Sequence, residues 1–297
     1  MVFSNHLRLY GLFAAMGIAM LWSGWIVLSR MGVTRDFSVS DIMLVRYATA
    51  AIVALPLAFL WWPRHLAWWK IILLSITGAG VGYAGVSYAG MRFAPASHIG
   101  IVMNGSLPII VLLINAVLAK IRPSGWQWLF CLLIPLGFFI ILADRQFESS
   151  PLDLMTGYGL LLLASIQFGW YMVAGYQWGI TPRQLVACVP LVNGILAVLI
   201  WFAFPGNLHQ IARSEILLQA AYQGLGPSLI GVYLFYVANI YLGRQRTSAV
   251  MASVPVITTL LAIPILGEQP GLPTWIGMAV ATSALLALIF CSKSQDA

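Results

Sequence analysis

Charged residues are scarce in this chain. Only 8% of its 297 residues are Asp, Glu, Lys or Arg, 61% are hydrophobic, and the mean hydropathy is +0.92. Soluble domains carry about 25% charged residues, and the apolar residues here fall in blocks of roughly 18 to 25. These features exclude a soluble globular protein and predict an all-α, polytopic membrane protein surrounded by the lipid bilayer.

Cysteine is also rare. Cys131, Cys188 and Cys291 lie in separate apolar blocks and have no partners at metal-ligand spacing. We therefore expect no disulfide framework, no metal site and no cofactor. The apolar blocks also lack HExxH, GxSxG and paired carboxylates, so we predict that the protein is not an enzyme.

Acidic residues are missing from the middle of every apolar block. This argues against the deep carboxylate relay of many proton-coupled pumps and leaves facilitated transport open. The net charge is +7, but the basic residues occur singly between the blocks rather than as a patch, so nucleic acid is not expected as a partner. We expect the chain to act as a monomer.

The apolar blocks predict ten transmembrane helices joined by short loops. The first block is too long for a signal peptide and is retained as a span. Since no loop is long enough to hold an active-site domain, function is expected within the bilayer. The ten predicted spans are 9–29, 41–62, 70–91, 97–119, 126–144, 156–178, 184–204, 216–243, 247–267 and 273–292.

The distribution of charge between alternate loops indicates the orientation. Lys and Arg accumulate on the cytoplasmic side of membrane proteins. With both termini cytoplasmic, nine of the fifteen basic residues fall on that side and seven of the eight acidic residues fall on the other. We interpret Arg46 and Arg92, near predicted span ends, as snorkelling to the interface. An even number of spans with cytoplasmic termini is predicted.

The two halves of the sequence resemble each other. Coincidence is the alternative in a chain rich in Pro and Trp. Five spans per half force the second copy to insert upside down, so we predict two inverted five-helix repeats, residues 1–148 and 149–297, an arrangement that lets one site open alternately to two sides. The pairs that match at an offset of 147, or 145 for the last, are Ser106 with Ser253, Pro108 with Pro255, Pro123 with Pro270, Trp128 with Trp275, and Gly24-Trp25 with Gly169-Trp170.

Glycines and prolines interrupt several predicted spans. Gly78 and Gly82 in the third span form a small-xxx-small pair, which indicates close helix packing, although glycines among aromatic residues also let a helix bend. Pro108 and Pro255 each free a backbone carbonyl, which is tolerated where a helix lines protein or a cavity. The two prolines are interpreted either as kinks or as gating elements.

Polar and aromatic side chains lie deep in the predicted spans, where contact with lipid is costly. His98 either binds a substrate carboxylate, relays a proton, or is a hydrogen-bonded structural histidine. Hydrogen bonding between helices is the alternative for the other polar residues. Together these side chains suit a zwitterionic solute with an apolar side chain, and aromatic faces can hold its ammonium group. The candidate residues of a substrate cavity are Trp25, Tyr83, Ser87, His98, Asn104, Gln167, Trp170, Tyr233 and Asn239.

The whole pattern resembles the EamA branch of the drug/metabolite transporter superfamily. The resemblance rests on ten spans in two repeats, cytoplasmic termini, Pro108 and Pro255, and the sequence Leu266-Gly267-Glu268 that closes the ninth span. Glu268 matches the glutamate of the family's repeat motif, whereas the first repeat has Ile121 at the equivalent position. This departure leads us to interpret Glu268 as structural.

Within that branch the chain looks most similar to the YddG-type amino-acid exporters of the bacterial inner membrane, on the run from Tyr83 to Asn104 and the aromatic first and sixth spans. The resemblance implies a secondary transporter that exports amino acids, aromatic and other neutral ones, by alternating access through a central cavity. Phosphorylated substrates are disfavoured because no Lys or Arg is expected mid-span. The alternatives are efflux of hydrophobic cations or drugs and, from another class, a channel or a non-transporting membrane scaffold.

Overall fold

The computed structural model describes residues 5–118, 123–144 and 150–291. Ile121 and the predicted boundary between residues 148 and 149 lie outside the described residues. The helices of the first half are α1 (Asn5–Arg35), α2 (Val39–Trp61), α3 (Trp68–Thr77), α4 (Val81–Met91), α5 (Ala96–Leu118) and α6 (Gly125–Ile141). Those of the second half are α7 (Pro151–Gln177), α8 (Pro182–Ala203), η1 (Leu208–Gln210), α9 (Arg213–Gln219), η2 (Ala220–Ile230), α10 (Gly231–Tyr241), α11 (Arg244–Met251), α12 (Val254–Leu266) and α13 (Leu272–Cys291).

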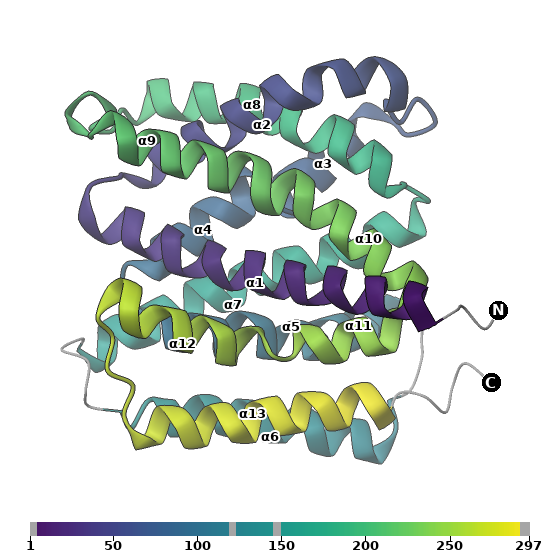
Figure 1. Cartoon of the computed structure of the whole chain (residues 1–297), viewed down its shortest axis with the longest axis vertical. Coiled ribbons are helices and arrows are strands. Elements are labelled where there is room, and N and C mark those ends of the chain that lie inside the picture. Colours follow the sequence, from purple (N-terminus) through teal and green to yellow (C-terminus); the bar gives the residue numbers. More distant parts are fainter. Residues whose placement is uncertain (1–4, 119–122, 145–149, 292–297) are drawn as a thin grey trace.

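The helices account for ten crossings of a membrane. In the described residues, nine helical segments are long and apolar enough to span a bilayer, and α6, with 17 residues, is the shorter tenth. Helix α1 begins and α13 ends at the same side of the bundle (Figure 1), as an even number of crossings requires. The predicted all-α, polytopic membrane fold is confirmed.

Helices of the two halves pack against each other reciprocally. Helix α2 lies on α8 at one edge of the molecule, and α6 lies on α13 at the opposite edge (Figure 1). Helix α1 contacts α10 and α12, and α7 makes the equivalent contacts with α4 and α5. Since α1 and α7 run in opposite directions (Figure 1), the chain forms two inverted five-helix repeats that exchange equivalent contacts.

Matching capping boxes begin the second helix of each repeat. The Asp41 backbone N–H donates to the Ser38 hydroxyl over 3.0 Å, and the Gln184 N–H donates to the Thr181 hydroxyl over 3.4 Å. A capping box satisfies N–H groups that the first turn of a helix leaves without partners. The two boxes are 143 residues apart in sequence. Equivalent positions in this part of the two repeats are therefore related by an offset of 143.

Two predicted spans at corresponding positions of the repeats are irregular. In the third, α3 ends at Thr77 and α4 begins at Val81. In the eighth, residues Ala220–Ile230 form a wider π-helical segment, in which the Ser228 hydroxyl donates to the carbonyl of Gln223, five residues back, over 3.1 Å. Interrupted helices at corresponding positions of two repeats mark the substrate region in many transporters.

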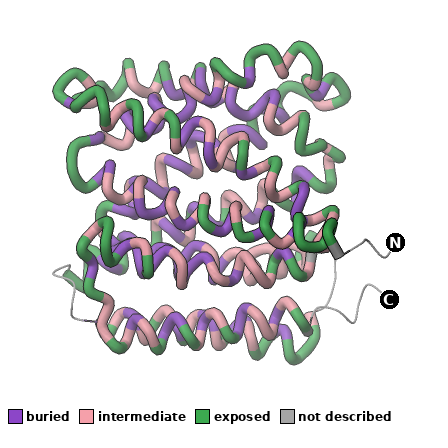
Figure 2. The backbone as a smooth tube through the Cα atoms, viewed as in Figure 1, coloured by how far each residue is buried: buried purple, intermediate pink, exposed green. Residues whose placement is uncertain are grey.

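Helix α5 is buried unevenly along its length. Residues 96–106 are buried except for Asn104, whereas all of residues 107–112 are partly exposed. At the offset of 147 the buried half corresponds to residues 243–253, and among their described side chains only Thr247 and Ala252 are buried. Figure 2 shows buried residues concentrated between the helices and exposed ones toward the outer edges and ends. The bundle therefore packs more closely around the N-terminal half of α5 than around its C-terminal half.

Candidate functional site

Four aromatic rings from both repeats form a chain inside the bundle, which we call the aromatic cluster: Trp25, Tyr83, Phe168 and Tyr171. The Trp25 and Tyr83 centroids are 5.9 Å apart with planes at 19°, Tyr83 and Phe168 are 5.4 Å apart, and Phe168 and Tyr171 are 5.6 Å apart. Such ring pairs attract each other beyond simple burial. Phe168 lies 143 residues after Trp25, so α1 and α7 contribute equivalent positions on either side of Tyr83.

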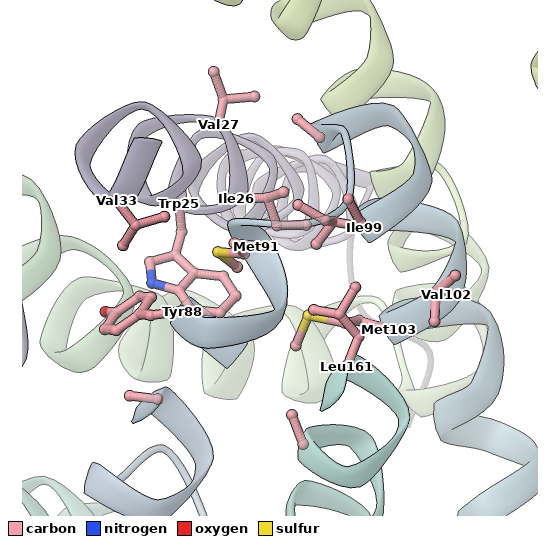
Figure 3. Close-up of a cluster of buried hydrophobic side chains, with 14 of the residues drawn as sticks. Trp25, Ile26, Val27, Val33, Tyr88, Met91, Ile99, Val102, Met103 and Leu161 are labelled. Carbon is pink, nitrogen blue, oxygen red and sulfur yellow. The ribbon is translucent and has the colours of Figure 1, made fainter. Parts of the chain in front are cut away.

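Arg46 lies against the aromatic cluster and is only 2% exposed. Its guanidinium carbon is 5.5 Å from the Trp25 ring centroid and 5.3 Å from that of Tyr47, and its Nη1 donates to the Tyr88 hydroxyl over 3.1 Å. Figure 3 shows Tyr88 beside the Trp25 indole. The prediction that Arg46 snorkels to the interface is wrong: α2 begins at Val39, and about two helical turns later the Arg46 side chain is buried between helices.

A chain of neutral hydrogen bonds continues from Tyr88. Its hydroxyl donates to Gln223 Oε1 over 3.2 Å, and Gln223 Nε2 donates to Ser29 Oγ over 2.8 Å and to Gln219 Oε1 over 3.0 Å. All four side chains are buried. This chain of hydrogen bonds joins α4 and α1 to the eighth span at its π-helical segment, and it supplies no negative charge to Arg46.

The break between α3 and α4 is held by side chains from two other helices. Asn193 Oδ1 accepts from Val81 N over 2.7 Å, Asn193 Nδ2 donates to Ser75 O over 2.9 Å, and the Tyr47 hydroxyl donates to the carbonyl before Gly80 over 2.5 Å. A Cβ at Gly80 would overlap the Ser75 carbonyl, so the close approach requires glycine. The bending interpretation of the glycines in this span is confirmed, whereas the small-xxx-small pair is separated by the break.

His98 sits in a closed hydrogen-bonded network. It is 0% exposed, its Nδ1 is 2.7 Å from the Tyr158 hydroxyl, and its Nε2 is 3.0 Å from Thr274 Oγ1. Thr274 in turn donates to Asp144 over 2.5 Å. Because both ring nitrogens have partners, this structure favours the structural interpretation of His98.

Glu268 ties the two repeats together at the N-terminal end of α5. Its carboxylate accepts from Ala96 N over 2.6 Å, from Ser97 N over 3.1 Å and from Ser97 Oγ over 2.9 Å. Arg30 Nε lies 3.3 Å from the same carboxylate, and Arg30 also donates to the Met91 carbonyl. A negative charge at a helix N-terminus is stabilising, so the geometry agrees with a structural role for Glu268.

The remaining candidates for the substrate cavity are dispersed. Gln167 lies beside Gly82 near the aromatic cluster, because a Cβ at Gly82 would meet Gln167 Oε1 at 3.0 Å. Trp170 packs edge-on against Trp178 at the end of α7, with centroids 5.6 Å apart, and Tyr233 is 59% exposed. Their role in binding substrate stays a prediction. The side chains that bond a carbonyl of their own helix are Ser87, Asn104 and Asn239.

The two matching prolines have different surroundings. Helix α5 continues through Pro108, whereas Pro255 is the second residue of α12 and follows the break that separates α12 from α11. Each of the two helices accepts a hydrogen bond from a serine of a neighbouring helix. Ser165 donates to the Met103 carbonyl of α5 over 3.3 Å, and Ser23 donates to the Val254 carbonyl of α12 over 3.2 Å. A gating role for the prolines stays a prediction.

Three residues of this region were missed as candidates: Arg46, Phe168 and Asn193. Asn193 carried a signal, since it is polar and lies within the predicted span 184–204. Phe168 carried one as well, through the offset of 143 that the capping boxes share. Arg46 could have been found as a charged residue inside the predicted span 41–62.

Comparison with known proteins agrees with this architecture. The model of the EamA-like transporter family matches the chain twice, over residues 9–143 and 155–290. Among solved structures 24 chains match, and one crystal structure has a TM-score of 0.66 at 19% identity, covering 99% of this chain and 100% of its own. At that identity the similarity shows the fold alone. No curated protein matches. Since the family model covers nearly all of both repeats, the chain belongs to the EamA-like transporter family, within the drug/metabolite transporter superfamily.

Proposed function

We propose that this membrane transporter exports amino acids, aromatic and other neutral ones, by alternating access. The observation that supports the proposal is the aromatic cluster, to which α1 and α4 of one repeat and α7 of the other contribute rings. Its faces suit an apolar side chain, and Gln167 adds a polar group nearby. The cluster lies between inverted repeats and next to the broken third span, where rocking of the repeats opens a site to either side.

The proposal places the protein in the bacterial inner membrane with both ends of the chain in the cytoplasm. Acidic residues in the first turns of α2, α7 and α9 lie at the end of the bundle opposite to the start of α1. Cytoplasmic loops are those that favour Lys and Arg. The loosely packed half of α5 then faces the cytoplasm, the side from which an exporter loads.

Transport by the purified full-length protein in liposomes tests this function. We expect saturable counterflow of labelled L-phenylalanine. Tyr83→Ala and Phe168→Ala each remove ring stacking worth roughly 0.5–1.5 kcal/mol, so the KM should rise by up to about tenfold. The matched control is Phe202→Ala, because Phe202 is 71% exposed on α8 and should leave the KM unchanged.

Absence of saturable flux of any neutral amino acid in the wild-type protein would contradict the proposal. Efflux of hydrophobic cations is the second candidate, since aromatic faces attract cations. Growth in the presence of methyl viologen separates the two: protection without amino-acid flux favours the cation. We favour amino acids because Arg46 places a positive charge 5.5 Å from the Trp25 ring, where a cation would be repelled.

A further inference from the structure

Arg46 carries a charge that the described part of the protein leaves unpaired. The ion pair found there, Arg30 with Glu268, lies elsewhere. Trp25, Tyr47 and Tyr88, the groups around the guanidinium, are neutral. An arginine stays charged in proteins, a buried charge without a partner is costly, and cation–π contacts offset only part of that cost. An anion beside Arg46 would supply the opposite charge that the described residues do not provide.

Among the residues that the structure describes, two buried donors at this position have no hydrogen-bond partner. They are Arg46 Nε and Trp25 Nε1. Buried polar atoms are almost always hydrogen-bonded, so orphaned donors call for an explanation. Two free N–H groups and one positive charge match the two oxygens and single charge of a carboxylate. A phosphate dianion would bring a second charge that no described side chain near Arg46 neutralises.

We propose that Arg46, with Trp25 Nε1, binds the carboxylate of the transported molecule. The inference rests on the proposed function and narrows it to monocarboxylates with an apolar or aromatic body, of which neutral amino acids are members. Tyr83 stacks on Trp25 and contacts Phe168, so these two rings receive the body of the ligand. Tyr83 and Phe168 are partly exposed whereas Trp25 is buried, so the ligand would enter from the side of Tyr83 and Phe168.

A comparison of matched ligands tests the inference in the wild-type protein. We would measure binding of 3-phenylpropionate and of its neutral amide, 3-phenylpropionamide, to detergent-purified full-length protein by titration calorimetry. The Kd of the acid should be lower than that of the amide by roughly tenfold or more, which corresponds to about 1.4 kcal/mol of binding free energy. L-phenylalanine should likewise outcompete L-phenylalaninol in transport. Equal binding of acid and amide would overturn the inference.

Variants locate the preference at Arg46. In Arg46→Gln the ratio of acid to amide affinity should fall to about one, and in Arg46→Lys it should fall only in part, because an ammonium keeps the charge and loses the planar geometry. The control is Arg92→Gln, an exposed arginine directly after α4, which should keep the wild-type ratio. Gel filtration and circular dichroism check that each variant is folded. If Arg46→Gln does not fold, the wild-type ligand comparison decides alone.

The outcomes separate this inference from the proposed function. Tight binding of 3-phenylpropionate without amino-acid flux contradicts amino-acid export and supports the carboxylate site. Amino-acid flux with an unchanged acid-to-amide ratio in Arg46→Gln keeps the exporter and overturns the site.

Discussion

Asn193 shows how one side chain stabilises a broken helix inside a membrane. It is 0% exposed, accepts from Val81 N, and donates to the carbonyls of Ser75 and Val189 over 2.9 and 2.8 Å. In lipid, backbone groups released by a helix break must be satisfied by protein or water. Asn193 thus makes the interruption of the third span tolerable.

Replacing Asn193 with alanine should destabilise the protein. Asn193→Ala leaves the Val81 N–H and the Ser75 carbonyl without partners, at a cost of about 1–3 kcal/mol for each buried group. Thermal unfolding of detergent-purified protein would show a clearly lower Tm. Asn115→Ala, at a partly exposed position near the end of α5, is the control and should unfold at the wild-type temperature. Equal Tm values for both variants would contradict the role of Asn193.

The residues of the site were harder to predict than the helices, for physical reasons. Hydropathy alone does not distinguish a charge at a span end from one turned inward, and Arg46 lies only five residues after the predicted start of its span at residue 41. Trp170 matched Trp25 in sequence, yet Phe168 is the residue that lies opposite Trp25 across Tyr83. A shift of two residues along a helix moves a side chain to a different face.

At the scale of elements, α6 and α13 approach each other through glycine. A Cβ built on Gly137 would lie 2.6 Å from the Gly277 carbonyl, and one built on Gly277 would lie 2.6 Å from the Gly137 carbonyl. Small residues let membrane helices come into backbone contact, where van der Waals packing drives their association. This pair therefore sets the distance between the two helices at one edge of the bundle.

A side chain at Gly137 should force these helices apart. We expect Gly137→Ala to lower stability by about 1–3 kcal/mol through overpacking, and Gly137→Val to lower it further. Thermal unfolding measures the loss. Gly159→Ala provides a matched control in α7, because a Cβ there meets no atom of the described residues within 4 Å. A Tm for Gly137→Ala as high as that of the control would show that the contact is not tight.

Most helices followed from hydropathy, while their interruptions did not. All ten predicted spans correspond to helical segments, because blocks of apolar residues leave a membrane chain few other options. The breaks in the third and ninth spans and the π-helical segment of the eighth lie inside blocks that are still apolar enough to be predicted as whole spans. The third break depends on a tertiary contact that hydropathy does not reveal, because Asn193 reaches it from α8, across 112 residues of sequence.

At the scale of the whole molecule, polar contacts close one end of the bundle. The pair of Arg30 and Glu268 joins α1 to the segment after α12, and the network of His98, Tyr158 and Thr274 joins α5, α7 and α13. Removing one partner of a buried ion pair is strongly unfavourable. These contacts therefore stabilise the state in which the N-terminal half of α5 is enclosed.

Neutralising Glu268 should open this end more often. The experiment starts from a protein in which the three native cysteines are replaced by alanine and Ile101 by cysteine. Ile101 is 1% exposed, so a membrane-impermeant maleimide should label this cysteine only when the end of the bundle opens. Adding Glu268→Gln should raise the labelling rate by roughly tenfold, corresponding to about 1.4 kcal/mol lost from the closed state. Asp153→Asn, which changes an exposed acid at the start of α7, should not raise it. An unchanged rate in Glu268→Gln would refute the closing role.

The uneven burial of α5 carries a consequence for the opposite orientation of the carrier. Residues 96–106 and 243–253 correspond at the offset of 147, yet residues 96–106 are enclosed and residues 243–253 are not. Under the proposed alternating access, if each copy took on the conformation of the other, residues 243–253 would be enclosed and the more exposed half of α5 would be replaced by its counterpart on the opposite side of the membrane. One chain thus already holds both local conformations, and the proposed cycle would need only that the two repeats exchange them.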